Sequence, residues 1–104
     1  MRSTFLSASV LSFALASSAF VHGAHAQGDV AAAQALYDKA VEQMAAKSYA
    51  EACPKLEEVT RLMPEGLGAK LTLAECYEGQ GRLASAWLQY SLVEAAAGRA
   101  GQGE

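Results

Sequence analysis

The side chains in this sequence that could carry chemistry are two cysteines and two groups of acidic residues, namely Cys53, Cys76, Glu57 with Glu58, and Glu75 with Glu78. Two carboxyl groups can act as general acid and base, and two thiols can bridge elements or exchange electrons. The cysteines do not form a C-x-x-C motif, which disfavours redox chemistry. The acidic groups have no histidine nearby, so a solvated helix face is the better interpretation.

The first 26 residues have the features of a secretory signal peptide. Arg2 gives a basic start, residues 5–21 are apolar apart from several serines, and Ala24 and Ala26 are the small residues that a signal peptidase reads. An uncleaved membrane anchor is the alternative, but the serines leave fewer than about 18 consecutive apolar residues. We therefore expect cleavage after Ala26, export to the periplasm or the extracellular space, and no stable membrane anchor afterwards.

Composition excludes several classes of function. Both histidines, His22 and His25, belong to the predicted leader, so an exported chain has neither a histidine-based triad nor the ligands of a four-coordinate N/S metal site. Eight basic against eleven acidic residues, with no basic cluster, disfavour nucleic-acid binding. We expect no catalytic, cofactor-binding or metal-binding residue, and hence a protein that is not an enzyme.

Apolar residues recur every three or four positions after residue 29, which is typical of amphipathic helices. Breaks at residues 47–48, 64–66 and 79–81 divide the chain into four predicted helices joined by short turns. No segment alternates with period two, so the predicted fold class is all-α, built from two antiparallel helix-turn-helix hairpins. The glycines from residue 98 onward predict an end of the fourth helix and a flexible tail over 99–104.

Two local features concern the second helix. Ser48 and Glu51 have the spacing of a capping box, in which each side chain bonds the backbone N–H of the other residue. Pro54 removes one hydrogen bond of the helix and crowds its preceding turn, so we predict a mild bend there.

Identical or similarly apolar residues recur at an offset of 34 positions. The matching pairs are Ala40 with Ala74, Tyr49 with Leu83, Ala52 with Ala86, Leu56 with Tyr90, and Val59 with Val93. Such an offset indicates two copies of one helical unit, which we place at about 33–66 and 67–98 within a domain of residues 27–98. A generic four-helix bundle with an accidental repeat is the alternative.

The second copy resembles a tetratricopeptide repeat in its Leu73, Ala74, Tyr77, Gly81, Ala86 and Tyr90. The runs at 49–54 and 73–78 are similar to exported bacterial repeat proteins that contain two cysteines. If the hairpins stack as they do in such repeats, the second and third helices pack together, and a Cys53–Cys76 disulfide becomes possible. Two free core thiols, or a redox pair, are the alternatives.

The resemblance also implies a function in binding another protein or peptide. In similar repeats the first helix of each hairpin faces a groove that holds a partner peptide, through positions that here include Gln34 and Gly68. The residues that we expect to bind the partner are Tyr37, Asp38, Val41, Leu71, Thr72 and Glu75. The alternative is that these residues form only the solvated side of two helices. We expect no cofactor.

A second hypothesis is a structural or assembly subunit that associates with itself through its last helix. Leu88 and Leu92, four positions apart, would then form an exposed ridge for assembly. Trp87 and Tyr90 have the spacing of the buried stripe, so we predict that both lie in the core.

Overall fold

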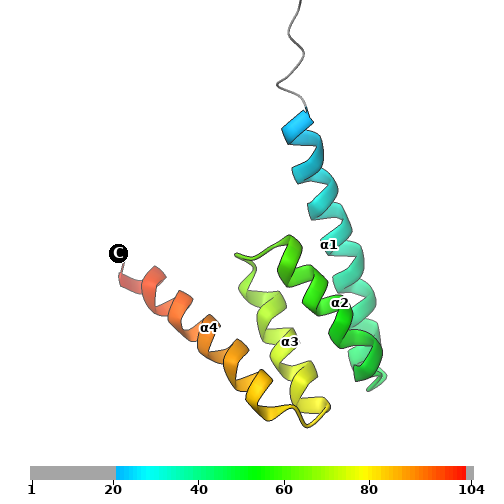
Figure 1. The fold of residues 1–104 in the computed structure, drawn as a ribbon, viewed down its shortest axis with the longest axis vertical. Helices are drawn as coiled ribbons and strands as arrows, with labels where there is room; N and C mark the ends of the chain where they lie inside the picture. Colours follow the sequence, from blue (N-terminus) through cyan, green and yellow to red (C-terminus); the bar gives the residue numbers. More distant parts are fainter. Residues whose placement is uncertain (1–20, 103–104) are drawn as a thin grey trace, which may run out of the picture.

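The computed structural model describes residues 21–102, so most of the predicted leader lies outside the described residues. Four helices make up this part of the chain: α1 (Val21–Ala45), α2 (Tyr49–Leu62), α3 (Leu67–Gly79) and α4 (Leu83–Gln102). Figure 1 shows that successive helices run in opposite directions. No strand occurs among the described residues, and the all-α prediction is confirmed. None of the helices over 21–102 combines the length and the apolar character that a membrane span requires.

The helices pack in chain order, with α1 against α2, α2 against α3, and α3 against α4. The core lies between them and consists mainly of small and aliphatic side chains. Its larger cluster of buried residues consists of Ala40, Ala52, Cys53, Leu56, Leu73, Cys76, Tyr77 and Ala86. The alanines of the repeat allow neighbouring helix axes to approach closely, because they place only a methyl group between two backbones.

Two residues in left-handed conformation end the first and third helices. Lys47 has φ 58° in the turn between α1 and α2, and Gly81 has φ 73° in the turn between α3 and α4. Glycine adopts this conformation without steric cost, so the turn predicted at residues 79–81 is explained by Gly81.

The capping box predicted for α2 is wrong. The side chain of Ser48 forms no capping hydrogen bond. The carboxylate of Glu51 instead accepts a hydrogen bond of 3.1 Å from Gln43 Nε2, on α1. Glu51 is therefore used to join two helices, and its backbone N–H donates to the Ser48 carbonyl at 3.2 Å.

Helix ends also differ from the sequence-based expectation. α1 already includes residues 21–28, ahead of the start expected near residue 29, and α4 continues to Gln102 rather than ending near residue 98. Alanine is the strongest helix former, and alanines surround the glycines at both places, which offsets the roughly 1 kcal/mol that each glycine costs. Pro54 lies inside α2 without interrupting it.

Candidate protein-binding surface

The first helices of the two hairpins meet through one hydrogen bond. The hydroxyl of Tyr37, on α1, lies 3.1 Å from Oγ1 of Thr72, on α3. Thr72 also donates to the carbonyl of Gly68 at 3.0 Å, which uses its single proton. Tyr37 is therefore the donor to Thr72, and the two predicted surface positions are held together.

The other predicted surface residues flank this hydrogen bond. Val41 on α1 and Leu71 on α3 are 42% and 40% exposed, a large fraction for aliphatic side chains. Asp38 accepts a hydrogen bond of 2.8 Å from Gln34 Nε2 on its own helix, and Glu75 is exposed on α3. We call these six residues, Tyr37, Asp38, Val41, Leu71, Thr72 and Glu75, the α1/α3 surface.

An open cavity of about 240 Å³ lies next to the α1/α3 surface. Its lining comes from α1, from the end of α2 and from the start of α3, and consists of Val30, Ala33, Gln34, Tyr37, Val59, Met63, Gly68 and Ala69. Sequence reasoning places Gln34, Tyr37 and Gly68 on the groove side of the first helices, but it does not predict the other lining residues as part of a site. Val59, on α2, and Met63, directly after α2, lie at this cavity only because the helices pack as they do.

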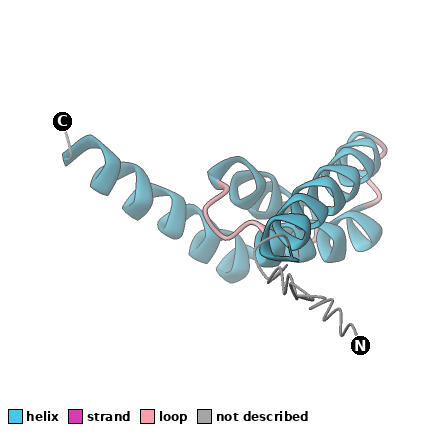
Figure 2. Cartoon of the chain, turned by 90° about the horizontal axis from the view of Figure 1, so that it is seen from above, coloured by secondary structure: helices cyan, strands magenta, loops and turns pink. Residues whose placement is uncertain are grey.

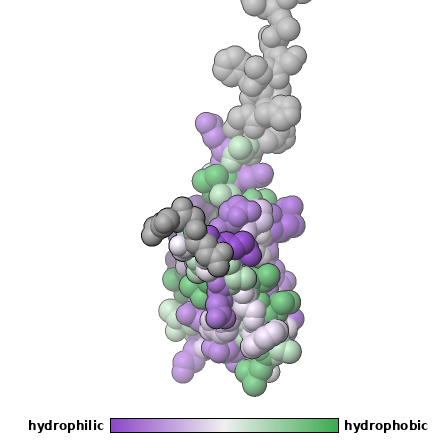
Figure 3. All heavy atoms as spheres, turned by 90° about the vertical axis from the view of Figure 1, so that its left-hand side faces the viewer, coloured by the Kyte–Doolittle hydropathy of each residue, from purple (hydrophilic) through white to green (hydrophobic). Residues whose placement is uncertain are grey.

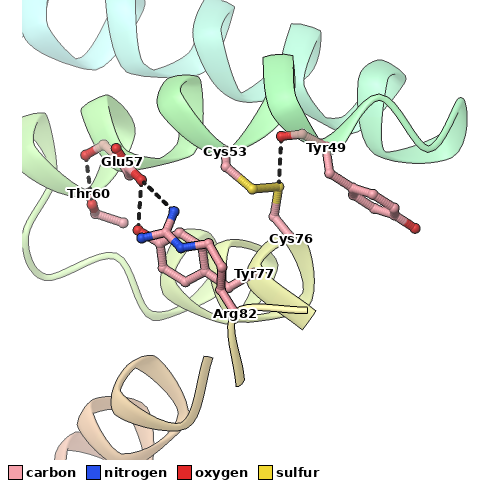
Figure 4. A network of polar contacts seen from close by, with 7 residues as sticks. All are labelled: Tyr49, Cys53, Glu57, Thr60, Cys76, Tyr77 and Arg82. Carbon is pink, nitrogen blue, oxygen red and sulfur yellow. Dashed lines mark hydrogen bonds and ion pairs between the residues drawn. A yellow bond between two sulfur atoms is a disulfide. The ribbon is translucent and has the colours of Figure 1, made fainter. Parts of the chain in front are cut away.

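A disulfide joins the two hairpins. Cys53 on α2 and Cys76 on α3 are bonded, with their Cα atoms 5.7 Å apart, and both side chains are buried. Figure 4 shows Sγ of Cys76 close to the backbone of α2, where it lies 3.5 Å from the carbonyl oxygen of Tyr49. The predicted pairing is confirmed, and no free cysteine remains.

A second contact between α2 and α3 was not predicted. The hydroxyl of Tyr77 donates to Oε1 of Glu57 at 2.8 Å, and the guanidinium of Arg82 lies 4.4 Å from the centre of the Tyr77 ring (Figure 4). Burial of Tyr77, together with the hydrogen bond to Glu57 and its negative charge, raises the pKa of Tyr77 to about 12. Glu57 is thus engaged in a structural contact.

Two further acidic candidates, Glu58 and Glu78, have local partners. A hydrogen bond from Arg61 lowers the pKa of the Glu58 carboxyl. Glu78 accepts a hydrogen bond of 3.3 Å from the Tyr90 hydroxyl, and partial burial followed by the Glu78 charge raises the pKa of Tyr90. Within residues 21–102, no three histidine, cysteine or acidic side chains come together as metal ligands.

The last helix differs from the prediction in one residue. Leu88 and Leu92 are 52% and 46% exposed, so the expected ridge faces outward. Trp87, however, is 69% exposed, and its predicted place in the core is wrong. Trp87 lies near the start of α4, and within residues 21–102 α4 packs against α3 alone, so no helix covers its other side (Figures 1 and 2). Tyr90 is half-buried and packs against the core.

Figure 3, which faces the side where α4 lies, shows apolar residues at the surface among polar ones.

Comparison with known proteins gives one match. Residues 43–87 match the family described as Tetratricopeptide repeat, and this segment contains all of α2 and α3. No curated protein and no solved structure matches the chain significantly. The family match, the stacked antiparallel helices and the buried alanines at the repeat offset agree with one another. Residues 43–87 are therefore similar to a tetratricopeptide repeat.

Proposed function

We propose that this protein is a non-catalytic module that binds a segment of another protein on the α1/α3 surface. Tetratricopeptide repeats typically mediate binding to other proteins, so the family match favours a function in protein binding. The observation that supports the α1/α3 surface as the binding site is the hydrogen bond from Tyr37 to Thr72, because it holds the exposed faces of two helices side by side. A surface held in this way needs little reorganisation when it binds a ligand.

The chemistry of the α1/α3 surface suits an extended or helical peptide with apolar side chains. Val41, on the helix of Tyr37, and Leu71, on the helix of Thr72, offer exposed aliphatic contacts. The neighbouring cavity can receive one large apolar side chain, and such anchors contribute most of the affinity in many peptide interfaces. Asp38 and Glu75 give the surface a negative charge that would favour basic residues beside the anchor.

The proposed lack of catalysis is supported by the state of the acidic side chains. Glu57 accepts from Tyr77, Glu58 pairs with Arg61, and Glu78 accepts from Tyr90. Each of these carboxylates therefore has a structural partner, whereas a general acid or base must be free to exchange a proton with a substrate.

We also propose that the protein is exported. The support is the leader composition of residues 1–26, and a buried disulfide fits an oxidising compartment. Mass spectrometry of protein recovered from the cell envelope would give a mass that begins at Gln27 if cleavage occurs after Ala26. A full-length chain retained in the cytoplasm would contradict export.

Peptide selection provides the test of the binding proposal. A random 12-residue library displayed on phage would be selected on the purified protein, and recovered peptides would be measured by fluorescence polarisation. Leu71→Glu should abolish binding, because it places a charge in the middle of the α1/α3 surface. Leu92→Glu is the matched control, since Leu92 is similarly exposed but lies on α4. Equal loss with both variants, or with neither, would contradict the proposed site.

Self-association through Leu88 and Leu92 is the second candidate function. The observation in its favour is that two large aliphatic side chains, four residues apart on α4, are about half exposed. Sedimentation across a concentration series, with Leu88→Glu and Leu92→Glu alongside, separates the two functions. A monomer at every concentration would eliminate self-association and leave peptide binding unaffected.

A further inference from the structure

One row of residues on α2 holds α3 in place. The ring of Tyr49 packs on Gly79, Cys53 is bonded to Cys76, and Glu57 accepts the hydrogen bond of Tyr77. The three α2 residues are spaced by four, so they form a single stripe along one side of the helix.

The internal repeat assigns an equivalent row to α4. At the offset of 34 residues, Tyr49, Cys53 and Glu57 correspond to Leu83, Trp87 and Ser91, which we call the α4 row. Leu83 and Trp87 are 68% and 69% exposed, the highest values among the large apolar residues that lie exposed in the described part of the chain. On α2 this stripe is covered by α3, whereas on α4 no helix of residues 21–102 covers the equivalent stripe.

Other pairs of residues at the offset of 34 have the same environment on α2 and α4, which supports this equivalence. Ala52 and Ala86 are both buried at the contact within their hairpins. Leu56 and Tyr90 both pack in or against the same core cluster. The exposure of Leu83 and Trp87 thus follows from the lack of a helix on that side of α4 within residues 21–102.

We propose that the α4 row binds a helix of a partner protein that resembles α3 in composition. The face of α3 that meets α2 offers a glycine opposite a ring, an uncharged side chain at the centre, and a tyrosine hydroxyl at the polar end, through Gly79, Cys76 and Tyr77. A partner helix with a small residue opposite Leu83, an uncharged residue opposite Trp87 and a hydrogen-bonding group near Ser91 would meet the same requirements.

A second copy of this chain does not offer such a helix in the repeat register. The α1 residues that correspond to Cys76, Tyr77 and Gly79 are Glu42, Gln43 and Ala45. Stacking α1 of one copy on α4 of another would place the Glu42 carboxylate against Trp87, and burial of an unpaired charge is strongly unfavourable. The α4 row therefore suits a partner with an uncharged face better than it suits α1 of a second copy.

Trp87 is the only tryptophan, so its fluorescence reports directly on the α4 row. The probe is a synthetic peptide of residues 66–82 with Cys76→Ala, which contains α3, and the control is a peptide of residues 32–46 from α1. The α3 peptide should shift the emission of Trp87 to shorter wavelength in a saturable manner, and the α1 peptide should not. Leu83→Glu should remove the shift, whereas Leu92→Glu should keep it.

A cross-link tests the register independently. The variant Trp87→Cys places a thiol at the position equivalent to Cys53, and the α3 peptide with its natural Cys76 supplies the second thiol. Air oxidation removes two electrons and two protons from the thiols, and oxygen accepts them as the S–S bond forms. The yield of the mixed disulfide should be several-fold higher than with a peptide in which Cys76→Ser and Glu75→Cys move the thiol by one position.

Circular dichroism of each variant establishes that the fold is retained, which we expect because Leu83 and Trp87 are exposed. Equal shifts with both peptides, or equal cross-linking with both cysteine positions, would overturn the proposal. A shift of Trp87 emission that grows with protein concentration in the absence of peptide would also overturn it, because a second copy would then cover the α4 row.

Discussion

The ring of Tyr49 occupies the space that a side chain at residue 79 would need. A Cβ atom built on Gly79 would lie 2.5 Å from Cζ of Tyr49, which is closer than any real contact of this kind. The end of α3 can therefore approach the start of α2 closely only because Gly79 has no side chain. This close approach lies next to the disulfide between Cys53 and Cys76, so the same region is held by a covalent bond and by tight packing.

Gly79→Ala should destabilise the protein by about 1 to 3 kcal/mol, because the new methyl group must displace an aromatic ring from a packed position. The measurement is the midpoint of urea unfolding. Gly98→Ala is the matched control, since a Cβ there would meet nothing within 4 Å and the residue lies inside α4. That control should leave stability unchanged or raise it by up to about 1 kcal/mol. Equal effects of the two variants would contradict the contact.

Loss of the disulfide should lower the free energy of unfolding by about 3 kcal/mol, because the bond closes a loop between residues 23 positions apart and restricts the unfolded chain. The comparison is between the parent and the double variant Cys53→Ser with Cys76→Ser, by thermal unfolding. Alkylation of unfolded but unreduced protein, followed by intact mass, checks the bond itself. Two added labels would show that the thiols are free.

Ala86→Leu should destabilise the second hairpin by about 1 to 3 kcal/mol, because Ala86 is 2% exposed and lies between two closely packed helices. The same change at Ala32, which is exposed on α1, should alter stability little. Circular dichroism during heating measures both. If Ala86→Leu unfolds at the temperature of the parent, the repeat register that underlies the α4 row is wrong.

Tyr77 should ionise only at strongly alkaline pH. Its pKa rises from 10.0 to about 12, mainly through burial and then through the hydrogen bond to Glu57. The folded state favours the protonated phenol, so the raised pKa of Tyr77 contributes to the free energy of unfolding. This contribution is complete below about pH 10 and is lost as the pH rises toward 12. Absorbance of tyrosinate during alkaline titration should show a late transition that Tyr77→Phe removes. An unchanged titration curve would contradict the Tyr77–Glu57 hydrogen bond.

The sequence predicts the helices because their breaks depend on local chemistry. Gly81 ends a helix through its own left-handed conformation, and the apolar period is visible in any helical window. The repeat offset further predicts which alanines lie between helices, and Ala40, Ala52, Ala74 and Ala86 are all buried.

Other features depend on how the helices pack, which the sequence pattern does not specify. The stripe of α4 has the spacing of a buried face, yet Trp87 is exposed because no helix of residues 21–102 covers its side of α4. The cavity beside Tyr37 depends on residues from three helices. Glu51 has the spacing of a capping residue, but its carboxylate accepts a hydrogen bond from Gln43 of the neighbouring helix instead.

The central claim is that the α1/α3 surface binds a peptide, and mapping by NMR tests it most directly. A 15N-labelled sample of the protein would be titrated with a peptide selected from the random library. We predict that the amide signals that move lie on α1 near Tyr37 and Val41 and on α3 near Leu71 and Thr72, and that those of α4 stay in place. Signals that move only on α4, with residues 37–41 and 71–75 unchanged, would contradict the claim.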